Sequence, residues 1–453
     1  MANSNIVSYS GNLAVWVLLA YLAFGLDSKV LPESLNHAGH GGPIKSLTAS
    51  PDRNLLVSTS FDYSGLVWST HDMLEVSRLI GHDAAVNIAA FSPNGKYLAT
   101  GGDDSRILLW RLDDLAKNKD HPPILLRGHT AKVVDLVFSS DGSKLLSAGW
   151  DHVVRIWDVK TEKQVGLLRG HDGPVNAVEL TKDDKYVFTA GYDGTIRYWE
   201  LPERKFIRNI LDNGWGVNVM DVNETADLLM YGTTNGLMRI DSLQKGELLV
   251  ESYDEGVPIS ALKYYPETRK IFFGTMKGRV VIYDTQMMEV EKDFLAVHGP
   301  IWDLEYVPEK NSLIVAGLDD YLTEWLLGSF NTNYFLEKKS PRRFESDTDN
   351  NGALQFARKC SICHTLDTKD IGRRAGPPLN GVFGRKAGTV PGYPYSESLV
   401  HSQLIWNEVT IDKLFEAGPD VLTPGTKMPI QRIKTKKDRR DLIEFLKDAT
   451  KAQ

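Results

Sequence analysis

The chain has 453 residues, a length that ordinarily corresponds to two to four domains. Hydrophobic residues make up 42% of it and charged residues 25%, as in folded globular proteins rather than disordered or fibrous ones. The net charge of −7 argues against nucleic acid as a partner. This charge is uneven: residues from Asn350 onward carry 17 Lys/Arg and 11 Asp/Glu, or +6, which leaves −13 for the rest. Opposite charges favour guided docking, either between the two parts or with outside partners.

Residues 1–27 form the first distinct segment. No charged side chain precedes Asp27, and an apolar run extends from Leu13 to Leu26. The run is short for a membrane span but has the length of the apolar region of a signal peptide, and Ala23-Phe24-Gly25 offers a cleavage site. A longer interpretation, Ile6 to Leu26, is an uncleaved membrane anchor, and a third is a buried element of a cytosolic protein. The segment therefore predicts a signal peptide or an anchor, and in the second case association with a membrane.

The following region, residues 28–330, contains internal repeats. Short runs of strand-forming residues alternate with turn sequences such as Ser92-Pro93-Asn94-Gly95. Four segments carry histidine, a hydroxyl residue, aspartate and tryptophan at intervals of 18, 4 and 6 residues: His40, Ser58, Asp62, Trp68; His82, Thr100, Asp104, Trp110; His129, Ser147, Asp151, Trp157; and His171, Thr189, Asp193, Trp199. Three weaker repeats follow. One inner-strand position recurs through all seven repeats at steps of 42 to 47 residues: Lys45, Asn87, Val134, Asn176, Asn218, Ser260 and Asp303.

These repeats resemble the WD-repeat family of β-propellers. Seven repeats then predict a closed, all-β propeller with seven blades. The resemblance implies that the four histidines belong to hydrogen-bonded relays within single blades rather than to a metal site. The outer strand of the last blade would come from the stretch before His40 or from residues after Trp325, and the sequence leaves both open. Blades centred on Ile240 and Tyr283 lack the relay residues, so we expect them to be less regular.

Two further expectations concern the interior of the propeller. The recurring inner-strand position is mostly polar, so we expect it to line a hydrated central channel. Trp215 and Trp302 are expected to pack in the core. After the propeller, residues 331–351 are polar and lack periodicity, which indicates a surface linker.

The two cysteines of the chain, Cys360 and Cys363, are separated by two residues and followed at once by His364. This order suits covalent attachment of a c-type haem, in which each thiolate adds to one vinyl group and the histidine becomes an axial ligand. A zinc half-site is one alternative, but zinc needs about four ligands and no second cysteine pair exists. A thioredoxin-like pair is another, and it leaves the histidine unexplained. The motif therefore predicts one covalently bound haem.

The segment around this motif, residues 352–453, resembles class I cytochrome c, near its mitochondrial and bacterial c2 branch. The matching motifs are Gly376-Pro377-Pro378-Leu379, Gly381-Val382-Phe383-Gly384-Arg385 and Pro424-Gly425-Thr426-Lys427-Met428. The resemblance implies an all-α domain. Apolar spacing predicts helices at 352–359 and 438–449, which cross in the family. Gly352 and Phe356 should then meet Leu442 and Phe445.

The resemblance also implies roles for single residues. The carbonyl of Pro377 should accept a hydrogen bond from the His364 ring, which orients this ligand. Met428 should be the second axial ligand, so that His364 and Met428 are the metal ligands and the potential is raised. Donors to the haem propionates are expected at Arg385, Tyr393, Tyr395 and Trp406.

Several positions depart from the family pattern. Phe415 stands where a tyrosine is common near the distal methionine, and Ile430 replaces an aromatic residue. Asp420 and Val421 replace two lysines of the usual basic docking face. These changes put in doubt whether the domain serves the family's standard partners.

Together these features predict a multidomain protein, a seven-bladed propeller followed by an all-α cytochrome c domain. We expect an exported monohaem cytochrome that carries single electrons in a respiratory chain, with the propeller as a docking platform. The expected partners are a cytochrome reductase or a terminal oxidase. The expected location is the periplasm, or the mitochondrial intermembrane space in a eukaryote. The alternative is a periplasmic oxidoreductase whose propeller holds a second active site fed by the haem.

Overall fold

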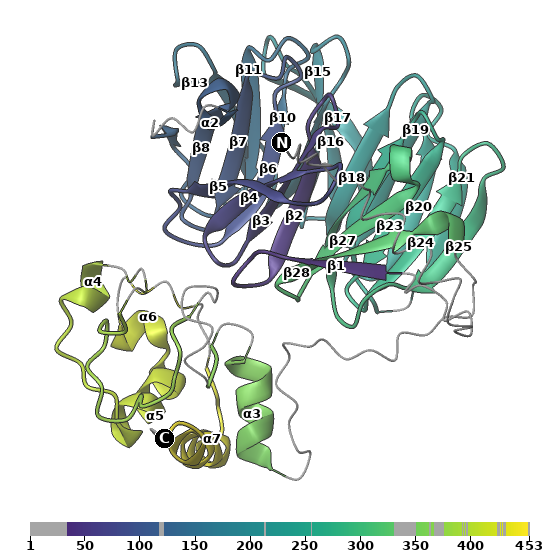
Figure 1. The fold of residues 1–453 in the computed structure, drawn as a ribbon. Helices are drawn as coiled ribbons and strands as arrows, with labels where there is room; N and C mark the ends of the chain where they lie inside the picture. The colour runs from purple at the N-terminus through teal and green to yellow at the C-terminus, as the bar shows by residue number, and fades with distance from the viewer. Residues whose placement is uncertain are drawn as a thin grey trace, which may run out of the picture.

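The protein consists of a β-propeller and a helical domain (Figure 1). The computed structural model describes residues 34–116, 122–212, 214–254, 256–329, 350–361, 364–366, 376–391, 393, 395, 397–423, 426, 428 and 432–451. The predicted signal peptide or anchor lies outside the described residues, as does most of the predicted linker. Within the described part of the chain, no helix has the length and apolar character needed to cross a membrane.

The propeller has seven blades, and each blade is an antiparallel sheet of four strands. Blades 1 to 3 contain β2 Ile44–Ala49, β3 Leu55–Ser60, β4 Ser64–Ser69, β5 Glu75–Ile80; β6 Val86–Phe91, β7 Tyr97–Gly102, β8 Arg106–Arg111, β9 Ile124–Arg127; and β10 Val133–Phe138, β11 Lys144–Gly149, β12 Val153–Asp158, β13 Lys163–Arg169. Blades 4 to 6 contain β14 Val175–Leu180, β15 Tyr186–Gly191, β16 Thr195–Glu200, β17 Lys205–Asp212; β18 Val217–Asn223, β19 Leu228–Thr233, β20 Leu237–Ser242, β21 Leu248–Tyr253; and β22 Ile259–Tyr265, β23 Lys270–Thr275, β24 Arg279–Asp284, β25 Glu289–Leu295. Blade 7 contains β26 Ile301–Val307, β27 Ser312–Gly317, β28 Tyr321–Leu326 and β1 Ser34–Ala38. Short helices follow β8, β26 and β28: α2 Leu112–Ala116, η1 Pro308–Lys310 and η2 Leu327–Ser329.

The ring is closed by its first strand. β1 pairs with β28, and Ser34 lies opposite Trp325 in the register. The inner strands contact their neighbours around the ring, and β26 contacts β2. The question left open by the sequence is thus answered: the stretch before His40 completes the last blade.

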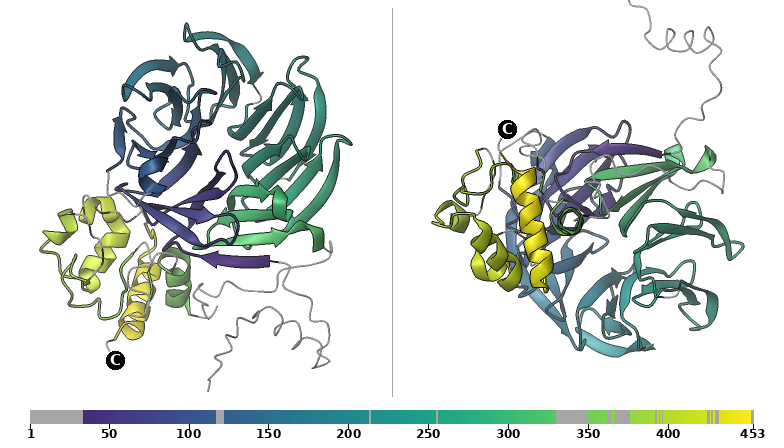
Figure 2. Two further views of the ribbon diagram at one scale, coloured as in Figure 1. Left: turned by 45° about the horizontal axis from the view of Figure 1, so that its top comes forward. Right: turned by 90° about the horizontal axis from the view of Figure 1, so that it is seen from below.

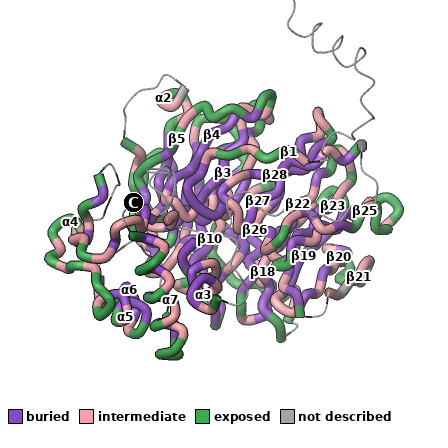
Figure 3. Tube along the Cα trace, turned by 60° about the horizontal axis from the view of Figure 1, so that its bottom comes forward, coloured by how far each residue is buried: buried purple, intermediate pink, exposed green. Residues whose placement is uncertain are grey.

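Burial in the blades follows from their radial packing. The second strand of each blade is enclosed by neighbouring blades on both faces, so β3 is buried along nearly its whole length, whereas the outer strand β17 is mostly exposed. Figure 3 shows the buried residues concentrated in the inner strands. The hydrophobic clusters join adjacent blades, as where Ile44 and Leu47 pack with Leu322. Adjacent blades are therefore held together by apolar contacts between their sheets.

A β-bulge occurs at one residue of every inner strand, and it corrects one alignment made from the sequence. In blade 7 the register skips Trp302, between Ile301 and Asp303. Trp302, not Asp303, is therefore the seventh member of the recurring position. Four members bond to the backbone of the next blade through their side chains: Asn87 to Val133, Asn176 to Val217, Asn218 to Ile259 and Ser260 to Ile301. The position thus joins adjacent blades.

The predicted relays are present in the first four blades. In blade 1, His40 Nδ1 lies 2.9 Å from Asp62 and Nε2 lies 2.7 Å from Ser58 Oγ, to which the Trp68 indole donates at 2.7 Å. The same contacts recur in blades 2, 3 and 4. All four histidines are buried. Their structural role is therefore confirmed.

The expectation that blades 5 and 6 are less regular is wrong. Both keep four strands, and the inner strand of each has its bulge at the same place as in the other blades. In blade 6 the relay hydroxyl and tryptophan are replaced by Phe273 and Tyr283, whose rings meet edge-on at 5.9 Å. Apolar packing thus substitutes for the polar relay without changing the sheet.

The expectation for Trp215 is also wrong, because this residue is 56% exposed. It follows blade 4 in a loop, and its neighbours at the same end of the propeller include exposed Trp150 and Tyr192. Trp302, in contrast, packs against Phe61 with ring centroids 5.5 Å apart.

The helical domain is built on two crossing helices, as predicted. It contains α3 Asn351–Lys359, α4 Glu397–Val400, α5 Glu408–Ala417, α6 Pro419–Leu422 and α7 Lys436–Ala449. At the crossing of α3 and α7, a Cβ on Gly352 would lie 2.1 Å from the Asp441 carbonyl oxygen and 2.6 Å from Phe445 Cβ, so only glycine fits there. Phe356 meets Phe445 at 5.5 Å and shares a buried cluster with Leu442.

Candidate haem site

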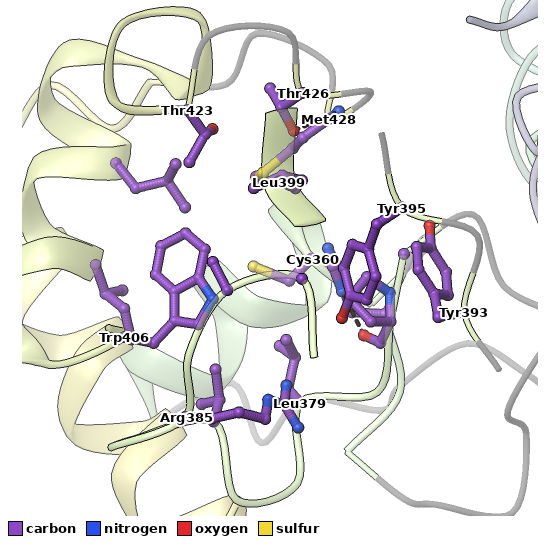
Figure 4. A pocket seen from close by; sticks show the side chains of 18 of the residues that line it. Cys360, Leu379, Arg385, Tyr393, Tyr395, Leu399, Trp406, Thr423, Thr426 and Met428 are labelled. Atoms are coloured by element: carbon purple, nitrogen blue, oxygen red, sulfur yellow. Dashed lines mark hydrogen bonds between the residues drawn. The ribbon is translucent and has the colours of Figure 1, made fainter. Parts of the chain in front are cut away.

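The helical domain encloses a hollow of about 1250 Å³, counting the part open to solvent. Its lining is mainly apolar, and it includes eight of the nine predicted site residues: Cys360, His364, Pro377, Arg385, Tyr393, Tyr395, Trp406 and Met428. Figure 4 shows side chains from separate elements arranged around this space, with the sulfur atoms of Cys360 and Met428 directed inward. The ninth residue, Cys363, lies outside the described residues.

The His364 ring is fixed by a backbone acceptor. Its Nδ1 lies 2.7 Å from the Pro377 carbonyl oxygen, the contact expected from the sequence. A side chain at Gly376 would clash with the ring, because a Cβ there would lie 2.4 Å from His364 Cε1. The ring thus donates through Nδ1, which leaves Nε2 as the atom that can bind a metal.

The end of α3 positions the Cys360 side chain. Its backbone N–H still donates to the Phe356 carbonyl, and its carbonyl accepts from His364 N–H at 2.8 Å. The thiol is buried and faces the hollow. The helix and the tight turn after it therefore place cysteine and histidine on the same wall.

Met428 reaches the hollow from the loop that precedes α7. Its backbone N–H donates to Thr426 Oγ at 3.2 Å, and its side chain packs against the buried cluster of the domain. Buried Phe415 belongs to the same cluster, at the position where the family often has tyrosine. The thioether is thus held by apolar packing and a local turn.

Arg385 is a half-buried cation whose hydrogen bonds go to the backbone. It donates to the Asn380 and Pro378 carbonyls, each at 2.8 Å, and among the described residues it forms no ion pair with a carboxylate. Burial lowers the pKa of the Arg385 guanidinium and raises the pKa of the Tyr395 hydroxyl. Tyr393 and Tyr395 pack together at 4.7 Å. These groups offer donors for carboxylates that enter from outside the chain.

The sequence missed two residues that line the same hollow. Phe61 and Tyr63 belong to the turn between β3 and β4 of blade 1, about 300 residues before the haem motif. No local signal predicts this, because the contact depends on how the domains pack. Figure 2 shows the helical domain beside the purple and blue strands of the first blades.

The lining residues fit a haem. A buried thiol, a fixed imidazole and a thioether share one apolar hollow, and Arg385, which has no carboxylate partner among the described residues, stands at its wall. These are the donor types that c-type haem sites use. Fold and site therefore define a WD-type propeller joined to a haem-binding helical domain.

Comparisons with known proteins agree with this class. Residues 350–450 match the family described as cytochrome c. Residues 33–69 match the WD domain, G-beta repeat, and residues 69–239 match the CAF1B/HIR1 beta-propeller domain. The chain belongs to the cytochrome c family through its C-terminal domain.

Relatives of this domain come from several eukaryotes. Cytochrome c of Gibberella zeae is 44% identical over 100 residues, which are 22% of this chain and 92% of that protein. Cytochrome c of Sesamum indicum is 46% identical over 100 residues, 22% of this chain and 87% of that protein. Cytochrome c of Kluyveromyces lactis is 33% identical over 111 residues, 24% of this chain and 99% of that protein. These relatives imply that the domain binds haem.

Proposed function

We propose that the chain is an exported monohaem c-type cytochrome that carries single electrons in a respiratory chain. In this proposal Cys360 and Cys363 attach the haem, His364 and Met428 are its axial ligands, and the propeller is a platform for redox partners. The observation that carries it is the meeting of the Cys360 thiol, the fixed His364 ring and Met428 in one hollow. A haem bound there would supply a one-electron iron couple.

The residues of this chain determine how such a group would behave. Because His364 and Met428 would both bind the iron, the site would be suited to electron transfer rather than to oxygen activation. Arg385 and the two tyrosines would hold the propionates, which otherwise would be costly to bury. The apolar cluster around Phe415 and Met428 would keep water from the second axial ligand.

The cofactor content of the purified full chain tests this proposal. The chain would be produced in cells that attach haem c, and its absorption spectrum, haem per chain and total metal would be measured. We expect one covalent haem that stays with the denatured polypeptide, and no second metal. A chain without covalent haem, or one with a metal held elsewhere, would contradict the proposal.

The platform role rests on charge and on exposed aromatic side chains. Residues before Asn350 carry a net charge of −13 and the remainder +6. Trp150, Tyr192 and Trp215 are 41%, 57% and 56% exposed in neighbouring turns of the propeller. Exposed tryptophan and tyrosine residues are frequent centres of protein interfaces. We therefore propose that a cytochrome reductase or terminal oxidase docks on Trp150, Tyr192 and Trp215, which we call the aromatic arc.

Partner docking can be measured with membranes that contain the reductase and the oxidase. Replacing Trp150 and Trp215 together by serine should reduce the rate of electron exchange at low protein concentration at least about tenfold. Ile80→Ser is the matched control, because Ile80 is 72% exposed on the outer strand β5. Equal rates for the wild type and the double variant would remove the aromatic arc from the proposal.

A further inference from the structure

The turn between β3 and β4 of blade 1 has a backbone conformation that is unusual for its residue. Tyr63 has a φ of +69°, in the left-handed region. The same position is glycine in blades 4, 5 and 6, namely Gly194, Gly236 and Gly278, with φ of +80°, +100° and +88°. Glycine adopts this region freely, whereas a bulky side chain there strains the backbone. Blades 2 and 3 also carry a side chain there, Ser105 and His152, with φ of +63° and +66°. Tyr63 is the largest of these three side chains.

The side chain of Tyr63 contributes to the haem site. Tyr63 and Phe61 line the same hollow as Cys360, His364 and Met428. Their turn is therefore part of the wall, although it belongs to another domain. The wall would be incomplete on this side if the propeller were absent.

Phe61 is held in place by its own neighbours. Its backbone N–H donates to the Pro43 carbonyl at 2.9 Å, and its ring packs on Trp302. Lys45 Nζ lies 4.5 Å from the Trp302 ring centroid and 5.8 Å from that of Phe61. Phe61 of blade 1 and Trp302 of blade 7 are thus both backed by the Lys45 cation within the propeller.

We propose that Phe61 and Tyr63 form the propeller's part of the haem site, where they exclude water and raise the reduction potential. This inference rests on the proposed function, since it requires that haem occupies the hollow. Ferric haem carries one more positive charge than ferrous haem, so a drier, more apolar surrounding disfavours the ferric form. Tyr63 acts by excluding water, and the iron ligands are other residues.

Tyr63→Gly in the full chain tests this inference. Glycine fits the left-handed turn, so the propeller should keep its stability while the wall opens. His152→Gly is the matched control, because His152 occupies the same turn position in blade 3, has φ +66° and is exposed. Tyr63→Phe keeps the ring and removes the hydroxyl. Each variant would be examined by redox titration, by its rate of reduction with a small ionic reductant, and by thermal unfolding.

We expect Tyr63→Gly to lower the potential and to speed reduction by the small reagent severalfold. His152→Gly and Tyr63→Phe should behave as the wild type, and unfolding should be unchanged or shifted upward in Tyr63→Gly. A wild-type potential and rate in Tyr63→Gly would overturn the inference, and so would an equal shift in His152→Gly. Haem per chain in the wild type tests the proposed function separately. One haem with no effect of Tyr63→Gly refutes this inference alone.

Discussion

The propeller and the helical domain have different kinds of interior. Side chains of the propeller fill its interior by packing between adjacent blades, and four blades satisfy their buried polar groups through the His–Ser/Thr–Trp relay. The helical domain instead surrounds a hollow that its own side chains leave open. A protein interior is normally close-packed, so such a space has to be filled by something else. The comparison predicts that the propeller keeps its fold without a ligand, whereas the helical domain needs one to fill its interior.

Removal of the haem attachment should give the largest effect. In the full chain with Cys360→Ala and Cys363→Ala, we expect the helices α3, α5 and α7 to lose protection from hydrogen exchange while the blade strands keep theirs. The physical reason is the open cavity, whose walls lose their contacts. Hydrogen exchange of the full chain, followed by mass spectrometry, measures both domains in one sample.

Ser361→Ala is the control for that variant. Ser361 lies beside Cys360 and donates to the Ala357 carbonyl at 2.8 Å, so its loss should cost only about 1 kcal/mol. Equal protection of the helices with and without the cysteines would show that the helical domain can close without haem.

The second prediction compares the polar relay of blade 3 with the apolar packing that replaces it in blade 6. Phe273→Ala in blade 6 should lower the free energy of unfolding by about 3–5 kcal/mol, because it removes a fully buried ring. Ser147→Ala in blade 3 should cost about 1–3 kcal/mol, because the His129 ring and the Trp157 indole lose their shared partner. Chemical denaturation monitored by circular dichroism measures both. A larger loss for Ser147→Ala would mean that the relay contributes more than apolar packing.

The third prediction concerns the crossing of α3 and α7. Gly352→Ala should destabilise the helical domain by about 1–3 kcal/mol, because the new methyl group meets the Asp441 carbonyl and Phe445. Intrinsic helix propensity alone would give the opposite sign, a gain of about 1 kcal/mol. The sign of the shift in the thermal transition of the haem-loaded protein therefore decides between close contact and propensity.

The last prediction concerns the dependence of stability on pH, and it belongs to the propeller. Burial raises the pKa of Asp135 to about 7, although its carboxylate accepts from Val178 and Leu136 N–H. In the unfolded chain this carboxyl ionises near pH 4. Between these values folding keeps a proton that the unfolded chain releases, so stability falls as pH rises from about 4 to 7.

Asp135→Asn should reduce this loss of stability. The change would be seen in thermal unfolding at pH 5 and pH 7.5, where the difference between the two temperatures should shrink. It should not vanish, since burial also raises the pKa of Asp221 to about 6 and that of Glu179 above its usual range. An undiminished difference would show that Asp135 is ionised in the folded protein at both pH values.

Local sequence motifs predicted which residues lie in the interior of the propeller blades and around the hollow of the helical domain. The relay spacing identified the blades because each relay lies within one sheet, and the Cys-x-x-Cys-His order identified the wall around His364 because its neighbours lie close in sequence. The sequence could not predict that β1 closes the ring, since that pairing joins residues 287 positions apart. It placed the recurring inner-strand position of blade 7 one residue too late, at Asp303 instead of Trp302, because both residues fit an approximate repeat. The sequence did not predict that Phe61 and Tyr63 line the hollow, because their position there depends on packing between the domains.

The closing strand also orders the assembly of the chain during synthesis. β1 is made first, yet its partner β28 is made last among the blade strands. Until residue 326 has emerged, β1 has no edge to join and six blades form an open arc. Contacts of such long range are slow to form, and an unpaired edge is open to pairing with other chains. The ring therefore cannot close before the whole propeller has been synthesised, and the helices of the second domain are made after its last strand.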